Sequence, residues 1–233
     1  KALRFKLFRR NRNIPLSDVL PMLEHLGLRV LGGRPYRIQK KDDATIWVYD
    51  FSVRYFGEAI IEIDKIKGKF QDAFLSTWQG LAEDDSFNRL VLSVGLSWRE
   101  VAMLRAYARY FKQTGFAFSQ TYIKDALVNH SHVTRLLVDF FELRFALNQP
   151  ASDAAETELR DKIIEQLDQV ASLDEDRILR RYLDMMSGTL RTNFYQQNAQ
   201  GGYKPYISLK LSPHTIPDIP RPLPMFEIFV YSP

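Results

Sequence analysis

Two sets of basic side chains are spaced so that each could bind an anion. The sets are Arg105, Arg109 and Lys112, and Arg177, Arg180 and Arg181. Guanidinium groups bind carboxylates through paired hydrogen bonds, so either set could hold a small anion or a carboxylate from another domain. The same spacing is typical of a solvated helix face with ion pairs one turn apart. The sequence leaves both interpretations open.

A third basic group lies in the stretch Tyr203-Lys204-Pro205-Tyr206, which follows a pair of glycines. A lysine between two tyrosines, next to a strand, could contact a ligand. A plain loop has the same composition, because Gly and Pro are the usual residues of turns. This stretch is therefore another candidate ligand site, and a plain loop is the alternative interpretation.

Signatures of the common catalytic and metal sites are absent from the sequence. It contains no G-x-G-x-x-G, no Walker loop, no H-E-x-x-H and no G-x-S-x-G. His130 and His132 are two positions apart, so on a helix they diverge, which favours capping or exposure over metal binding. The chain has no cysteine, which excludes disulfides and thiolate ligands. We expect no catalytic, cofactor-binding or metal-binding residue in this chain.

The composition is that of a folded protein with an uneven charge distribution. Hydrophobic residues make up 45% of the 233 residues, including 16 Phe and 11 Tyr. Residues 1–56 carry 12 Lys and Arg against 5 Asp and Glu, whereas residues 149–198 carry 6 against 10. A basic segment can indicate a nucleic-acid-binding module. Here the charges alternate with strand residues, as on a solvated sheet face, so we expect no nucleic-acid partner.

No apolar run approaches the roughly 20 residues that a membrane-spanning helix needs. The lack of cysteine fits a reducing compartment. We therefore expect no membrane partner and a cytoplasmic location.

The first 57 residues have the pattern of a β-α-β-β unit. Leu3, Phe5 and Leu7 alternate with basic residues, as in a strand with one wet face. A helix follows over 16–26, ended by Gly27, and extended segments cover 28–38 and 45–55. Lys40 to Asp43 reads as a polar turn. This order opens a ferredoxin-like βαββαβ sandwich, and the strand at 206–211 is one candidate to complete its sheet.

Helical patterns dominate residues 58–198. Apolar residues from Ile63 to Trp78 recur every three or four positions. Capping boxes open helices at Ser97 and at Ser172, each with a glutamate three positions later. Further helices are expected from Ser119, from His132, and after a break at Pro150. The sequence thus predicts a multi-helix region that lasts to about residue 197.

Residues 199–233 change character. A loop leads to a strand at 206–211, and residues 212–224 contain five prolines, which excludes a helix there. The last segment, MFEIFVYSP, alternates Phe226, Ile228 and Val230 with Glu227, Phe229 and Tyr231. Both faces are mostly apolar, so we expect a strand that is covered on two sides. Such a strand with nothing after it suggests that the chain is a piece of a longer protein.

Several sequence segments, spread over nearly the whole chain, resemble those of one protein family. They are LSDVLPMLEHLGLRVL (16–31), IWVYDF (46–51), FNRLVLSVGLSWREVAMLRAYARYFKQTGFAFSQ (87–120), SLDEDRILRRYLDMMSGTLRTNFYQ (172–196), and KPYISLKL with IPRPLPMFEIFVYSP near the end. Together they resemble the large NAD-specific glutamate dehydrogenases. In that family, ACT-like regulatory domains and helical motifs precede the catalytic domain.

The resemblance implies an α+β fold with three parts. They are an ACT-like unit over 1–57, a helical region over 58–198, and a loop and strands over 199–233 that lead into a catalytic domain. It further implies a parent enzyme that oxidatively deaminates L-glutamate to 2-oxoglutarate with NAD. Its partners would be its own catalytic domain and other subunits of a homo-oligomer. The family's catalytic lysine, catalytic aspartate and dinucleotide loop have no counterpart here.

Two roles for such a segment remain open. The first is regulation and assembly, with an amino-acid effector at the turn after the first strand, formed by Asn11, Arg12 and Asn13. ACT folds commonly place their effector at this turn. The second is a purely structural spacer that braces the oligomer and binds no small molecule. In both cases we expect the fragment alone to be inactive.

Overall fold

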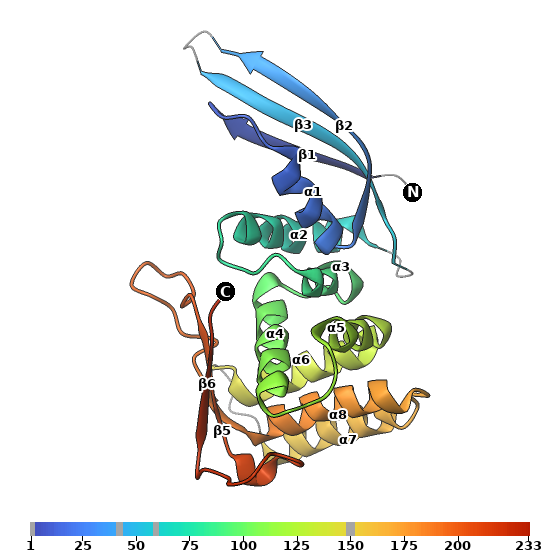
Figure 1. Cartoon of the computed structure of the whole chain (residues 1–233), viewed down its shortest axis with the longest axis vertical. Helices are drawn as coiled ribbons and strands as arrows, with labels where there is room; N and C mark the ends of the chain where they lie inside the picture. The colour runs from blue at the N-terminus through green and yellow to red at the C-terminus, as the bar shows by residue number, and fades with distance from the viewer. Residues whose placement is uncertain (1–2, 41–43, 58–60, 148–151) are drawn as a thin grey trace.

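The computed structural model describes residues 3–40, 44–57, 61–147 and 152–233. A three-stranded sheet with two helices lies at one end, an array of helices follows, and a second three-stranded sheet stands beside that array (Figure 1). The predicted α+β class is confirmed. Within the described residues no helix is long and apolar enough to cross a membrane.

The first sheet is antiparallel, with strand order β1-β3-β2. Its elements are β1 (Leu3–Arg10), α1 (Leu16–His25), β2 (Leu28–Gln39) and β3 (Thr45–Tyr55). Gly27 joins α1 to β2 at a φ of 88°, a backbone conformation that strongly favours glycine. The predicted β-α-β-β order is present. The turn expected at 40–43 lies largely outside the described residues.

One face of this sheet is covered by α1 and by α2 (Ile63–Trp78). The alternation in β1 turns Leu3, Phe5 and Leu7 inward, and Phe5 meets the ring of Phe74 of α2 at a centroid distance of 5.1 Å. Phe5 also stacks on Phe51, its partner in β3, at 6.4 Å. Aromatic packing of this kind holds the sheet to the helix below it.

Among the described residues, seven helical segments make up the middle of the chain. They are η1 (Ser86–Arg89), α3 (Leu90–Ser93), α4 (Trp98–Gln113), α5 (Gln120–Asn129), α6 (Ser131–Phe145), α7 (Asp153–Leu167) and α8 (Leu173–Gly188). The Ser97–Glu100 capping box is confirmed in both of its hydrogen bonds. Only half of the box expected at Ser172 forms, because the Glu175 carboxylate binds Asn129 and His130 instead. The break at Pro150 lies outside the described residues.

Helix α4 is the centre of the molecule, with twelve of its sixteen residues buried. It stands upright between the second sheet and the helices α5, α6 and α8 (Figure 1). A helix that is covered on nearly every side is a core helix, so its few polar side chains must find partners inside the protein.

The second sheet has strand order β4-β5-β6 and is antiparallel. Its strands are β4 (Thr189–Thr192), β5 (Ile207–Leu211) and β6 (Glu227–Tyr231), and the short η2 (Pro213–Thr215) lies between the last two. Strand β5 pairs with β4 and β6, so the idea that residues 206–211 complete the first sheet is wrong.

Strand β4 corrects the expectation of helix up to residue 197. The change occurs at Thr189, whose hydroxyl group donates to the carbonyl oxygen of Met185 and also bonds the hydroxyl group of Tyr107. Thr189 is the cap at which α8 ends, in an extended conformation. From there the chain pairs with β5, which sequence periodicity could not foresee.

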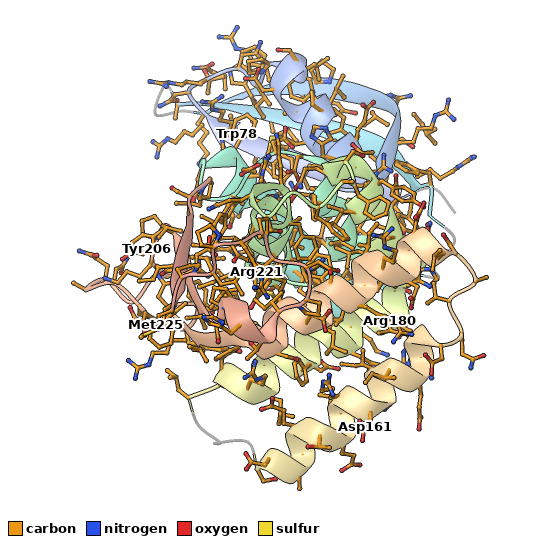
Figure 2. The ribbon with its side chains drawn as sticks, turned by 60° about the horizontal axis from the view of Figure 1, so that its bottom comes forward. Trp78, Asp161, Arg180, Tyr206, Arg221 and Met225 are labelled. Atoms are coloured by element: carbon orange, nitrogen blue, oxygen red, sulfur yellow. The ribbon has the colours of Figure 1, made fainter. Side chains whose placement is uncertain are left out.

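The last strand is covered on one face by the described residues. Phe229 and Tyr231 face inward, and the Phe229 ring lies 5.3 Å from that of Tyr110 in α4. On the other face Ile228 is 67% exposed and Val230 is 56% exposed. Met225, labelled at the rim in Figure 2, is 75% exposed. The expected cover of the second face is therefore not supplied by these residues.

We expect Phe74→Ala to lower the free energy of unfolding by about 3–5 kcal/mol, because it removes a fully packed ring from the junction of sheet and helix. Leu75→Ala is the matched control. Leu75 is the next residue and is 48% exposed, so its loss should cost about 1 kcal/mol or less. Urea denaturation followed by circular dichroism measures both. Equal losses for the two variants would contradict this packing.

Candidate functional site

The polar side chains of α4 connect it to three other parts of the chain. They reach the segment before η1, the loop after β4, and strand β6. Helix α4 stands beside the second sheet and below α2 and α3, so these contacts join the helical region to the second sheet (Figure 1). We call this set of contacts the α4 junction.

The deepest contact of the α4 junction is made by Arg105, which is fully buried. Its Nε and Nη2 atoms donate to the two carboxylate oxygens of Asp85 at 2.9 and 2.8 Å, and Nη2 also donates to Asn88 at 2.9 Å. Burial alone would lower the pKa of Arg105. The hydrogen bonds and charge of Asp85 outweigh burial, so the pKa is raised and the group stays charged.

Asp85 has a second task, because its carboxylate also accepts from the backbone N–H of Phe87 and caps η1. The neighbouring Arg109 pairs with Glu83 at 2.7 Å and is partly exposed. Lys112 is exposed. The first predicted basic set is therefore divided: Arg105 holds a carboxylate from a preceding segment, while the other two lie on a solvated face.

Arg99 forms the second contact, and it holds backbone rather than a carboxylate. Its guanidinium donates to the carbonyl oxygens of Lys204 at 3.0 Å and Phe194 at 3.3 Å. It also lies 5.0 Å from the ring centroid of Tyr203. Burial lowers the pKa of Arg99. The sequence left open whether the Tyr203–Tyr206 stretch contacts a ligand or is a plain loop. In the structure this stretch packs on α4.

Tyr110 forms the third contact. Its hydroxyl group donates to a carboxylate oxygen of Glu227 at 2.7 Å, and Gln113 donates to the other oxygen at 3.3 Å. Burial and the Glu227 hydrogen bond both raise the pKa of Tyr110, so its hydroxyl group is protonated at neutral pH. Strand β6 is thereby fixed to α4 by a polar bond as well as by Phe229.

Each arginine of the second basic set has different partners. Arg180, labelled on α8 in Figure 2, pairs with Asp176 at 2.8 Å and with Asp168 at 2.7 Å. Arg181 donates to the carbonyl oxygen of Pro217 and lies 3.5 Å from Asp218. The proline-rich connector is therefore held to α8 by Arg181. Arg177 lies over the ring of Phe118.

In the turn predicted to bind an effector, two side chains already accept hydrogen bonds from backbone N–H groups. Asn11 has a φ of 60°, and its side-chain oxygen accepts from the backbone N–H of Thr45 at 3.1 Å. The side-chain oxygen of Asn13 accepts from the N–H of Ile14 at 2.8 Å. Arg12 is exposed. The turn is well formed, and effector binding there stays a prediction.

Two of the histidines contact carboxylates of other segments. His130 Nε2 lies 2.8 Å from Glu175, and His25 Nδ1 lies 2.8 Å from Asp84. Across the residues that the structure describes, no group of three or more His, Asp and Glu side chains is arranged to hold a metal ion.

The partners in the α4 junction could not be found from sequence spacing. Arg105 and Asp85 are 20 positions apart, and Tyr110 and Glu227 are 117 apart. The available signal was the capping box at Ser97, which locates the start of α4, and the aromatic residues along that helix. Arg99, Asp85 and Tyr110 were missed as site residues.

Three family models match the chain in consecutive segments. Residues 1–66 match the glutamate dehydrogenase ACT3 domain, and residues 82–147 match glutamate dehydrogenase helical motif 3. Residues 162–233 match the catalytic domain of bacterial NAD-glutamate dehydrogenase. The α4 junction joins the second and third matches, because Asp85 and α4 lie in the second match and β6 lies in the third.

Curated relatives match along almost the whole chain. An NAD-specific glutamate dehydrogenase of Halomonas elongata is 48% identical over 98% of this chain, and one of Pseudomonas aeruginosa is 47% identical over all of it. One of Mycobacterium tuberculosis is 37% identical over 95%. The chain spans only 14–15% of the length of these relatives. Since all three segment matches and all three relatives name the same enzyme, the chain belongs to the NAD-specific glutamate dehydrogenase family.

Proposed function

We propose that this chain is a segment of an enzyme that oxidatively deaminates L-glutamate to 2-oxoglutarate with NAD, and that the segment regulates and assembles that enzyme. The names of the relatives support the reaction and the cofactor. The descriptions of the first two matches, an ACT domain and a helical motif, support a role outside the chemistry. The parent enzyme would bind NAD, and this segment would bind none.

The α4 junction is the observation that carries the regulatory role. Asp85 follows Asp84, which lies 2.8 Å from His25 of α1, and Glu227 lies in the sheet that matches the catalytic domain. Both are bonded to α4, which is buried and packed on nearly every side. A shift of the ACT-like unit would therefore move α4 and, through Tyr110, strand β6. Packed interiors transmit such displacements because they deform little.

We divide the segment into the ACT-like unit at 1–57, the helical region at 58–198 and the strands at 199–233. The proposed effector of the first unit is an amino acid bound at Asn11, Arg12 and Asn13. In the alternative, the same junction is a rigid spacer with no small-molecule site. Saturable binding of an amino acid to the chain would separate the two roles.

The partners proposed for the segment are its own catalytic domain and other subunits of a homo-oligomer, in the cytoplasm. Support for the first comes from the exposed apolar face of β6, where Ile228 and Val230 are mostly open to solvent. The match to the catalytic domain includes this strand. The remainder of that domain would supply the missing cover.

The isolated chain should form no NADH from L-glutamate and NAD, because it spans a small part of the relatives that carry the reaction in their names. The intact enzyme, assayed by NADH absorbance under the same conditions, is the positive control. Turnover by the purified chain at a rate comparable with that of the intact enzyme would refute the non-catalytic role.

Arg105→Met should lower the free energy of unfolding by about 3 kcal/mol, because Asp85 then loses its bidentate partner inside the protein. Arg109→Met is the matched control on the same helix. Its pair with Glu83 is partly exposed, so we expect a loss of about 1 kcal/mol or less. Denaturant titrations of both variants measure the difference. In the intact enzyme, regulation should be impaired by the first variant alone.

Ile228→Lys tests the proposed cover of β6. In the isolated chain we expect a change within about 0.5 kcal/mol, because the side chain is 67% exposed. In the intact enzyme the charge would be buried, so thermal stability and activity should both fall. Tolerance of Ile228→Lys in the intact enzyme would rule out a buried position for this face.

A further inference from the structure

A cavity of about 690 Å³ lies where the end of the first sheet meets the helices. Tyr55 and Phe56 come from the end of β3, Arg89 from η1, and Ser93 from α3, while Asp125 and Asn129 come from α5. The cavity is therefore shared between the ACT-like unit and the helical region. None of its residues belongs to the α4 junction.

Arg89 is the cationic side chain among the described residues that line this cavity. Its guanidinium lies 4.9 Å from the ring centroid of Phe56, and its Nε atom is buried without a hydrogen-bond partner. Within the described ranges no carboxylate pairs with it, whereas Arg105, Arg135 and Arg180 each have one. A partly buried guanidinium with an unmet donor is costly unless an anion or water satisfies it.

Three residues with hydroxyl groups, Tyr55, Ser93 and Ser131, line the same cavity as Arg89. The Ser93 hydroxyl oxygen is buried and has no hydrogen-bond partner. Tyr55 is close enough for the charge of Arg89 to act on it, although burial dominates and raises its pKa, so the hydroxyl stays protonated. Two buried polar groups without partners in one cavity indicate a missing acceptor. A carboxylate has acceptor sites for several such donors at once.

The residues of α5 that line the cavity offer acceptors. Asp125 carries a negative charge and forms an ion pair with Lys124. Asn129 adds an amide group. A ligand with two negative groups would be repelled by Asp125, and so would a doubly charged phosphate. A single carboxylate with a hydroxyl or amino donor elsewhere in the molecule matches both sets of residues.

We propose that this cavity binds a small carboxylate that carries a hydrogen-bond donor, with the carboxylate on Arg89 and the donor toward Asp125 and Asn129. Such a ligand would connect the end of the first sheet to α5 and hold the two parts at a fixed distance. The inference concerns this chain's own residues and does not depend on the reaction proposed above. Either can fail without the other.

The test is a titration of the 233-residue chain with L-lactate, propionate and inorganic phosphate at constant ionic strength. L-lactate and propionate differ by one hydroxyl group, so the pair isolates the donor. The readout is the NMR signal of the Arg89 Nε–H, assigned by its disappearance in Arg89→Gln. We expect a saturable shift with L-lactate, about three- to tenfold weaker binding of propionate, and the weakest response with phosphate.

Arg89→Gln should weaken L-lactate binding by about tenfold or more, followed through backbone amide signals of α5. Arg191→Gln is the matched control, because Arg191 is exposed on β4, away from the cavity. This variant should bind L-lactate as the unaltered chain does. Tyr55→Phe removes only a hydroxyl group, so it provides a second test if Arg89→Gln does not fold. We expect Tyr55→Phe to weaken the binding of L-lactate and of propionate by a few fold.

Three results would overturn the proposal. One is the lack of a saturable response to L-lactate in the unaltered chain. Another is unchanged binding in both Arg89→Gln and Tyr55→Phe. The third is stronger binding of phosphate than of either carboxylate, which would make this an anion site of a different chemical class.

Discussion

The buried pair between Arg105 and Asp85 is the constraint on which the arrangement of this molecule depends. A charged guanidinium with no exposed surface needs partners inside the protein, and the bidentate carboxylate together with Asn88 bonds its Nε and Nη2 atoms, while Nη1 is buried without a hydrogen-bond partner. Replacing such a pair by apolar groups can be neutral for stability. We therefore interpret the role of this pair as setting the relative position of the two segments that it joins. Because Asp85 also caps η1, the pair fixes the position of η1 relative to α4, and η1 in turn contacts α1 of the first sheet's unit.

A central helix that is buried on nearly every side makes this positional role possible. Alanines at 102, 106 and 108 let neighbouring elements approach α4 closely, while Tyr107 and Tyr110 reach outward to fixed partners. Tyr182 of α8 in turn donates to the backbone oxygen of Leu104. The contacts on different sides of α4 are therefore not independent, since a shift of the helix toward the second sheet would strain its bonds to Asp85 and to α8.

Local signals in the sequence predicted the elements well, and long-range partners not at all. Strand β3 and the capping box of α4 were predicted because alternation and capping are properties of a few neighbouring residues. Strand β4 was missed because it is four residues long and starts where a helix ends. Glu175 fits a capping box by spacing, yet its carboxylate binds residues of α5. Such competition is decided by tertiary structure, which spacing does not encode.

The two sides of the second sheet differ in a way that bears on the proposed regulatory role. Its inner face is fixed to α4 through Phe229 and the Glu227 carboxylate, while its outer face leaves Ile228 and Val230 exposed. Any partner that covers the outer face must therefore contact a strand whose position is already set by α4. Asp85 holds α4 from the other end and adjoins Asp84, which pairs with His25 of α1, so under the proposed function that partner and the ACT-like unit would act on the same element. Coupling between them then requires no flexible relay, only a displacement of α4 that both contacts share.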